Sequence, residues 1–117
     1  MARVSSGDAA ALGAPELLLL ATRDGAAAIG RDDLGALEPG RWADVVHLST
    51  DDPAFLHLEP GPGGDAALLS NLVWAAGGRL VRDVWVAGEQ VLAAGEPTRV
   101  DRGEVQAQAR AVARRLR

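Results

Sequence analysis

The segment from Leu34 to Leu48 limits the fold more than any other part of the chain, because turn-forming residues lead directly into an apolar run. Pro39-Gly40 suits a type II turn, in which proline takes the first central position and glycine supplies positive φ at the second. The next residues, Ala43–Leu48, are apolar apart from Asp44 and His47 and predict a first β-strand. Such a run is typical of a strand covered on both faces, so the fold needs material on either side of it.

A helix is predicted ahead of this segment, over residues 14–30. Pro15 suits the first helical position, where its missing N–H removes no hydrogen bond. Apolar residues then recur at helical spacing up to a stop at Gly30. Gly25 inside this helix costs about 1 kcal/mol against alanine, which indicates close packing at that position. Residues 1–13 are small and polar and form a loose lead-in.

A second helix is predicted over residues 66–76, after a loop from Thr50 to Asp65 that is rich in aspartate, proline and glycine. Asp65 is placed to cap this helix. The side that we expect to be buried consists of Leu68, Leu69, Leu72 and Val73.

The clearest hairpin signal covers residues 81–93. Val84 and Val86 share one face of its first strand, while Trp85 and Ala87 share the other. Two turns compete. Gly88-Glu89 as the central pair suits a type II′ turn, whereas Ala87-Gly88 requires a type I′ turn with Ala87 at positive φ.

A C-terminal helix is predicted over residues 101–117. Asp101 and Glu104 have the spacing of a capping box. An apolar stripe then recurs at helical spacing and consists of Val105, Ala109, Val112 and Leu116. Arginines gather near the end of the helix, where positive charge is favourable: Arg110, Arg114, Arg115 and Arg117.

Composition excludes several kinds of chemistry. The 117 residues include no cysteine, lysine or tyrosine, which removes disulfides, thiolate metal sites and Schiff-base catalysis. A net charge of −4 argues against a nucleic-acid surface. No apolar run is long enough for a transmembrane segment, and no signal region precedes Gly7-Asp8, so we expect no membrane association and a cytoplasmic location.

The fold class that these elements predict is α+β. Three strands at most, with two or three helices, form a small core whose stability margin is thin at this length. The strand edges also need partners. The pattern therefore indicates either missing material or a chain that associates with itself.

Four blocks of the sequence resemble, in order, the C-terminal part of the metal-dependent amidohydrolase superfamily. They are residues 19–30, the segment 34–48 with Gly35, Gly40 and Asp44, residues 72–78, and residues 81–88 with Val91. The Val-Trp-Val-Ala-Gly sequence of the last block is most similar to the aminohydrolase branch, which deaminates nitrogen heterocycles. That branch usually has Asp or Asn before the hairpin glycine, and Ala87 departs from this usage.

The resemblance implies an architecture and a place within it. Residues 14–30 would correspond to the last helix of a (β/α)8 barrel, and residues 31–100 to part of the β-sandwich that follows the barrel. The segment 34–48 would then be the junction between the two. Full-length members bind zinc or iron through a His-x-His pair and further residues on barrel strands that precede the matching stretch. This chain has no His-x-His, so no catalytic, cofactor-binding or metal-binding residue is carried over.

Several residues are candidates for a functional site on the basis of their side-chain chemistry. His47 is expected to be a partly buried, hydrogen-bonded side chain rather than a metal ligand. His57, with Asp51, Asp52 and Glu59 nearby, forms the alternative metal candidate. Asp44 is expected to accept backbone N–H bonds rather than act as a general base.

Other motifs favour structural roles. Ser49-Thr50-Asp51 lacks the spacing of a nucleophilic triad with His47. Pro60–Gly64 lacks the lysine and hydroxyl of a phosphate-binding loop and is expected to be a connection. The three tryptophans are expected in core or interface packing: Trp42, Trp74 and Trp85.

Two functions therefore follow from the sequence. In the first, the chain is the C-terminal part of a hydrolase of non-peptide C–N bonds, structural in itself because the metal site lies elsewhere, and its partner is the remainder of the barrel. In the second, it is a stand-alone, non-catalytic protein that pairs its strand edges with a second copy.

Overall fold

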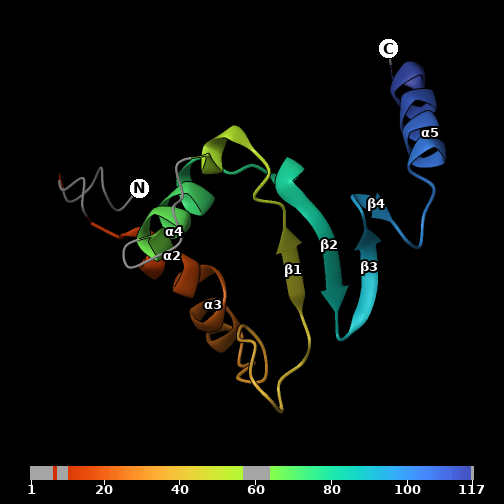
Figure 1. Ribbon diagram of the computed structural model, residues 1–117. Helices are drawn as coiled ribbons and strands as arrows, with labels where there is room; N and C mark the ends of the chain where they lie inside the picture. Colours follow the sequence, from red (N-terminus) through yellow and green to blue (C-terminus); the bar gives the residue numbers. More distant parts are fainter. Residues whose placement is uncertain (1–6, 8–10, 57–63, 117) are drawn as a thin grey trace.

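The computed structural model describes residue 7, residues 11–56 and residues 64–116. One four-stranded antiparallel sheet, with strand order β1-β2-β3-β4, runs through the middle of the molecule. Figure 1 shows α2, α3 and α4 on the β1 side of this sheet and α5 beyond β4, at the opposite end. The α+β class is confirmed, and the described residues contribute one sheet rather than two packed layers.

Two helices occupy the region where one was predicted. Helix α2 spans Ala14–Ala21 and α3 spans Arg23–Ala28. The chain breaks at Thr22, whose φ of −120° and ψ of −92° are not helical and whose Oγ1 donates to the carbonyl of Leu18 at 2.6 Å. The expected close packing at Gly25 is confirmed, because a Cβ there would lie 2.9 Å from the carbonyl oxygen of Leu20.

Helix α4 spans Gly64–Trp74, two residues earlier than predicted, and lies against α2. Asp65 is therefore in the first turn rather than at the N-cap. The short 3₁₀ helix η1, Pro53–Phe55, precedes α4, and a second one, η2, spans Gly78–Leu80. Phe55 and Leu80 are buried and anchor these two turns.

Strand β1 spans Val45–Leu48, β2 spans Val81–Val86 and β3 spans Glu89–Ala93. A fourth strand, β4, covers only Glu96–Pro97. The sequence did not predict it, because two residues carry no alternation pattern.

The hairpin turn between β2 and β3 has Ala87 and Gly88 as its central residues. Both have positive φ, 52° and 81°, and Val86 pairs with Glu89 across the turn. Positive φ at both central positions is the requirement of a type I′ turn, which decides between the two predicted alternatives. The β3–β4 turn repeats the arrangement, with φ of 49° at Ala94 and 82° at Gly95.

The apolar surface of the chain is poorly covered. Four hydrophobic residues are buried among the described residues: Ala14, Ala26, Phe55 and Leu80. The described residues do not supply the cover that the apolar run of the first strand requires, since Val46 is 58% exposed; β1 also lies at the edge of the sheet. The radius of gyration is 18.1 Å, whereas a compact domain of this length has about 13 Å.

Helix α5 spans Arg102–Arg115, and all of its described side chains are exposed. Half of the predicted capping box is confirmed, because Asp101 Oδ1 accepts a hydrogen bond from the Glu104 N–H at 2.8 Å, whereas Glu104 Oε1 accepts from Gln108 Nε2 at 3.1 Å. The stripe that begins at Val105 has no covering element among the described residues. Among all the residues that the structure describes, no helix has the length and apolar character needed to cross a lipid bilayer.

Candidate functional site

The polar contacts of the sheet centre on two aspartates that hold the two tight turns. Asp44 Oδ1 accepts a hydrogen bond from the Ala87 N–H at 2.7 Å, and the Gly88 N–H donates to the carbonyl of Ala43 at 2.9 Å. The expectation that Asp44 accepts a backbone N–H is thus confirmed. Its carboxylate ties the start of β1 to a turn more than forty residues away along the chain.

Asp83 repeats this arrangement one strand further on. Its Oδ1 accepts from the Ala94 N–H at 2.9 Å, while the Gly95 N–H donates to the carbonyl of Arg82 at 2.7 Å. Each Ala-Gly turn is therefore held by an aspartate and by the carbonyl of the residue before that aspartate. We call these two units the aspartate-held turns.

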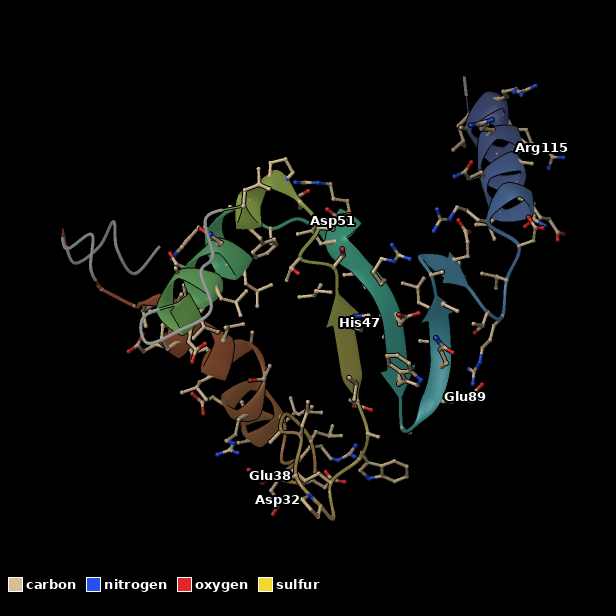
Figure 2. The ribbon with its side chains drawn as sticks, viewed as in Figure 1. Asp32, Glu38, His47, Asp51, Glu89 and Arg115 are labelled. Carbon is tan, nitrogen blue, oxygen red and sulfur yellow. The ribbon has the colours of Figure 1, made fainter. Side chains whose placement is uncertain are left out.

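Asp83 also connects three strands through its side chain. His47 Nδ1 on β1 lies 2.8 Å from Asp83 Oδ2, and Gln90 Nε2 on β3 donates to Oδ1 at 3.2 Å. The Ala94 N–H, followed by the contact with His47, holds the pKa of the Asp83 carboxyl below its usual range. Figure 2 shows His47 on β1, beside β2. The carboxylate is thus the polar centre of the sheet.

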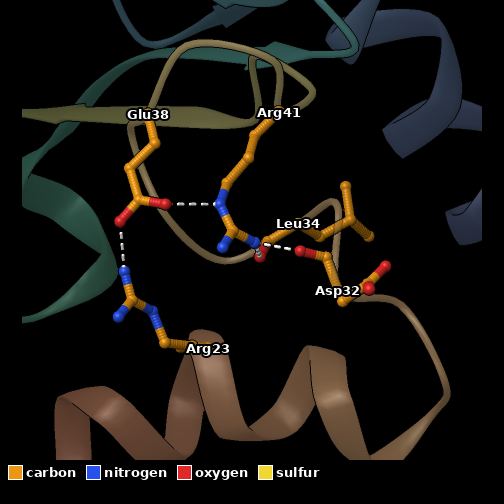
Figure 3. A network of polar contacts seen from close by, with 5 residues as sticks. All are labelled: Arg23, Asp32, Leu34, Glu38 and Arg41. Atoms are coloured by element: carbon orange, nitrogen blue, oxygen red, sulfur yellow. Dashed lines mark hydrogen bonds and ion pairs between the residues drawn. The ribbon is translucent and has the colours of Figure 1, made fainter.

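A second polar cluster holds the loop between α3 and β1 (Figure 3). Glu38 forms ion pairs with two arginines: its Oε1 lies 2.5 Å from Arg23 Nη2, and its Oε2 lies 2.7 Å from Arg41 Nε. Arg41 also donates to the backbone carbonyls of Asp32 and Leu34. The hydrogen bond from Arg41, reinforced by the charge of Arg23, lowers the pKa of Glu38. We call these five residues the loop cluster.

Gly35 brings this loop against the break between α2 and α3. Its φ is +78°, and a Cβ at this position would lie 2.7 Å from the backbone carbonyl carbon and oxygen of Thr22. Only glycine fits both the conformation and the approach. The loop cluster and Gly35 together fix how the helices meet β1.

An open hollow of about 430 Å³ lies between the helices, this loop and β1. Its lining is mostly apolar and includes Ala26, Leu34, Leu37, Val45 and Val46. Since several of these side chains are exposed, the hollow is uncovered apolar surface rather than an enclosed binding cavity.

The predicted site candidates do not gather into one site. His47 is hydrogen-bonded as expected but is 60% exposed, more than predicted. Asp51 is exposed, whereas Asp52 caps η1 through the Ala54 N–H at 3.0 Å and pairs with Arg79 at 3.1 Å. The Ala54 N–H is the main reason that the pKa of Asp52 is lowered.

Two candidates cannot be placed. His57 and Glu59 lie outside the described residues, as does the Pro60–Gly64 segment apart from Gly64, which begins α4. Ser49 Oγ accepts from the Asp51 N–H at 3.2 Å, a local turn contact rather than part of a triad.

The donor set that the structure describes does not fit a catalytic zinc or iron. No group of three histidine, aspartate or glutamate side chains converges anywhere in residues 11–56 and 64–116. His47 and Asp83 form a pair, and such a metal requires at least three protein ligands. No step of catalysis is therefore assigned to these residues.

Core packing, one of the two predicted roles of the tryptophans, does not apply to Trp42 and Trp74. Trp42 and Trp74 are both about half exposed, and Trp85 on β2 is partly covered. Two residues that organise the polar contacts, Asp83 and Arg41, had no predicted role. A signal for Asp83 is present, because an Asp-Val pair stands at both positions, Asp44-Val45 at the start of β1 and Asp83-Val84 within β2.

The family model of the amidohydrolase family matches residues 1–91. The chain belongs to the amidohydrolase family. A 5-methylthioadenosine/S-adenosylhomocysteine deaminase from Teredinibacter turnerae is 41% identical over 108 residues, which are 92% of this chain and 23% of the relative. A protein of the same description from Moorella thermoacetica is 36% identical over 109 residues, 92% of this chain and 24% of the relative.

Solved structures of zinc-containing amidohydrolases have the same fold. An adenosine deaminase from Xanthomonas campestris with bound zinc superposes with a TM-score of 0.83 and 34% identity, over 97% of this chain and 24% of that chain. An atrazine chlorohydrolase from Arthrobacter aurescens, complexed with zinc, gives a TM-score of 0.72 and 29% identity, over 86% of this chain and 20% of that chain. The chain thus spans about a quarter of the length of its relatives.

Proposed function

We propose that this chain is the C-terminal, non-catalytic part of a zinc-dependent hydrolase that deaminates an adenosine-like nucleoside. Its role is to support the catalytic part, which supplies the metal ligands. The observation that carries this proposal is the combination of deaminase similarity along nearly the whole chain with a described donor set that does not fit a metal.

The substrate class rests on the activities of two proteins that the chain resembles. The deaminase of T. turnerae is 41% identical, and the adenosine deaminase of X. campestris reaches a TM-score of 0.83. The chlorohydrolase of A. aurescens gives a lower score of 0.72 and less coverage. Both comparisons favour an aminopurine nucleoside over a triazine.

The uncovered surface of the chain favours a role in which the chain packs against the catalytic part and stabilises it. The accessible surface of the chain is 8799 Å², whereas a compact monomer of its mass exposes about 6,000 Å². The excess includes the edge strand β1 and the hollow beside it, where Leu37 and Val46 are exposed. Burial of such apolar area contributes about 25 cal/mol per Å². Contact with the catalytic part therefore stabilises both this chain and the catalytic part.

The polar contacts hold the helices and the sheet of the chain in one arrangement. The loop cluster and Gly35 fix the angle between the helices and β1. The aspartate-held turns fix the sheet. The chain thereby presents α2, α3 and β1 to the catalytic part as one preset surface.

A chimera tests this function. In the T. turnerae deaminase, the segment that matches this chain is replaced by the chain itself, and deamination of 5-methylthioadenosine and the zinc content are measured. We expect a folded, zinc-containing chimera with kcat/KM within about 10-fold of the parent, a difference of about 1.4 kcal/mol. The deaminase without the segment serves as the negative control.

A matched substitution separates support from catalysis. In the same chimera, His47→Ala should leave kcat within about 3-fold, because His47 contacts Asp83 and no metal ligand set. A loss of kcat with unchanged zinc and folding would make the chain catalytic and contradict the proposal. A folded but inactive chimera, together with exchange-protected β1 amides in the isolated chain, would favour a stand-alone homodimer paired through strand edges.

A further inference from the structure

Helix α5 lies apart from the surface that the proposed function assigns to the catalytic part. Figure 1 shows it beyond β4, at the end of the sheet opposite to α2, α3 and α4. Arg102 fixes its start, because it donates to the carbonyl of Gly95 at 2.5 Å and pairs with Glu96 at 3.4 Å. No described element covers any of its fourteen helical residues. The helix therefore points away from the contacts proposed for α2, α3 and β1.

The apolar stripe of α5 is narrow and consists of four residues with a 4-3-4 spacing: Val105, Ala109, Val112 and Leu116. Because successive helical residues are about 100° apart, all four fall within a sector of about 60°. A helix that packs on a broad core carries an apolar face of at least about 100°, whereas this narrower spacing is that of the seam between two paired helices. Val105 and Val112 are 51% and 55% exposed, so the seam is uncovered by the described residues. The stripe therefore fits one other helix.

The charged side chains of α5 leave this seam open to a helix of the same sequence. Arg110 and Arg114 lie about 130° and 170° around the helix axis from the middle of the stripe. From Val105 onward, the flanking residues are uncharged apart from one arginine: Gln106, Gln108, Ala113 and Arg115. Two copies of α5 can thus meet at their stripes without placing like charges against one another.

An antiparallel arrangement matches the side-chain sizes along the seam. It sets Val105 against Leu116 of the other copy and Ala109 against Val112. Every layer then joins a smaller side chain to a larger one, which favours close packing. The surface is also self-complementary, as a twofold contact requires.

The two ends of α5 carry opposite charge, which favours the same arrangement. Glu104 lies in the first turn, whereas Arg114 and Arg115 lie in the last. In the antiparallel pair Arg115 comes level with the segment between Glu104 and Gln108 of the other copy, two side chains that are hydrogen-bonded at 3.1 Å. A parallel pair would instead bring the arginines of both last turns together and align the two helix dipoles.

We propose that α5 is a dimerisation helix that pairs with α5 of a second copy, antiparallel, around a twofold axis through the seam between Ala109 and Val112. Four layers of small and medium side chains bury less than the roughly 800 Å² per partner of a standard interface. Pairing of the isolated chain is therefore weak, with a dissociation constant on the order of 100 µM. The choice of a second copy over the catalytic part rests on the proposed function, whereas the seam itself does not.

Disulfide trapping tests the pairing, since the chain has no cysteine of its own. Ala109→Cys and Val112→Cys are made in separate copies, mixed in a glutathione buffer near the dissociation constant, and the disulfides are identified by mass spectrometry. In the antiparallel pair these two positions face one another, so mixed disulfides should exceed those between like copies at least about 5-fold. Ala107→Cys, on the opposite side of the helix, is the matched control and should be trapped at least about 5-fold less.

A charge in the seam should separate the copies. Val112→Glu should shift the mass measured by light scattering to that of the monomer, whereas Ala111→Glu, on the far side of α5, should leave it unchanged. Neither side chain contacts the body of the chain, and circular dichroism checks that both variants stay folded. Salt raised from about 20 to 500 mM should increase the mixed disulfide about 2-fold, because it screens the repulsion between two copies of like charge.

Other results would overturn the inference. Disulfides mainly between like copies would show a parallel pair. Equal trapping at Ala107 and Ala109 would remove the stripe from the contact, as would equal masses of the Val112→Glu and Ala111→Glu variants. Loss of the mixed disulfide at high salt would show that ion pairs with a different surface hold α5. Deamination and zinc content of the chimera are independent of these outcomes, so a failure of the pairing is distinct from a failure of the proposed function.

Discussion

Asp44 Oδ1 lies 2.7 Å from the backbone nitrogen of Ala87, and this hydrogen bond joins the start of β1 to the type I′ turn between β2 and β3. A non-glycine residue at positive φ costs about 1–2 kcal/mol. The carboxylate offsets part of this cost, since hydrogen bonds to charged groups are stronger than those between neutral ones. The contact explains why Ala87 is tolerated where glycine, asparagine or aspartate is usual.

Removal of the Asp44 carboxylate should therefore loosen this turn. We expect Asp44→Ala to lower the free energy of unfolding by about 1–2 kcal/mol, because the Ala87 N–H loses its charged partner. Urea unfolding followed by tryptophan fluorescence measures the change, with Asp51→Ala as the control at an exposed carboxylate. Equal effects of the two substitutions would show that the contact does not stabilise the sheet.

Glycine in the two turns should have the opposite effect. Ala87→Gly and Ala94→Gly each relieve a positive φ and should stabilise the chain by about 0.5–1 kcal/mol, with additive effects because the turns are separate. Ala93→Gly, in the regular strand β3, should instead destabilise it by about 0.5–1 kcal/mol. The comparison uses the urea midpoints of the unmodified protein, the three single variants and the Ala87→Gly/Ala94→Gly double variant. A loss of stability from either turn variant would argue against the assigned turn geometry.

The α+β class and the hairpin could be predicted from the sequence because each rests on a local pattern of apolar and turn-forming residues. The place of Asp44 at a turn-to-strand junction predicts that it accepts a backbone N–H, but not that the donor is Ala87, 43 residues further along the chain. The break at Thr22 was not predicted, because the apolar residues continue at helical spacing across it; in the fold, the loop at Gly35 lies against the Thr22 backbone. The apolar run of β1 predicts that the strand requires burial, but it does not predict whether the same chain supplies the cover.

Asp83 should make the sheet sensitive to acid. Its folded pKa is lowered, mainly by the Ala94 N–H and then by His47. The unfolded carboxyl, with a pKa of about 3.9, binds the proton more readily, so the stabilisation is complete above about pH 5 and is lost as the pH falls through the folded pKa. Urea midpoints should fall between about pH 5 and 3, and less steeply in Asp83→Asn.

Some acid dependence should remain in that variant, because the pKa values of Asp33, Glu38, Asp52 and Glu89 are lowered as well. Asp51→Asn provides the matched control, since Asp51 pairs with no cation in the described part of the chain. If Asp83→Asn and Asp51→Asn followed the same pH profile as the unmodified protein, the contacts of Asp83 would contribute nothing to acid sensitivity.

Gly35 and Gly40 form a natural pair for testing the loop. Both have positive φ, +78° and +90°, yet a Cβ at Gly35 would collide with the Thr22 backbone while a Cβ at Gly40 would meet nothing within 4 Å. Gly40→Ala should cost about 1 kcal/mol from conformation alone, and Gly35→Ala at least about 1 kcal/mol more. Hydrogen exchange of α3 amides should rise in the second variant. Similar costs at the two positions would contradict the close approach to Thr22.

We propose that this chain is a non-catalytic part of a deaminase-type hydrolase and that the metal ligands lie in the rest of that protein. Metal analysis of the purified chain, combined with an ammonia-release assay on adenosine and 5-methylthioadenosine, tests this most directly. We predict below about 0.1 zinc or iron per chain after dialysis against either metal, and no deamination above background. About one tightly bound zinc or iron per chain, with measurable ammonia release, would contradict the account.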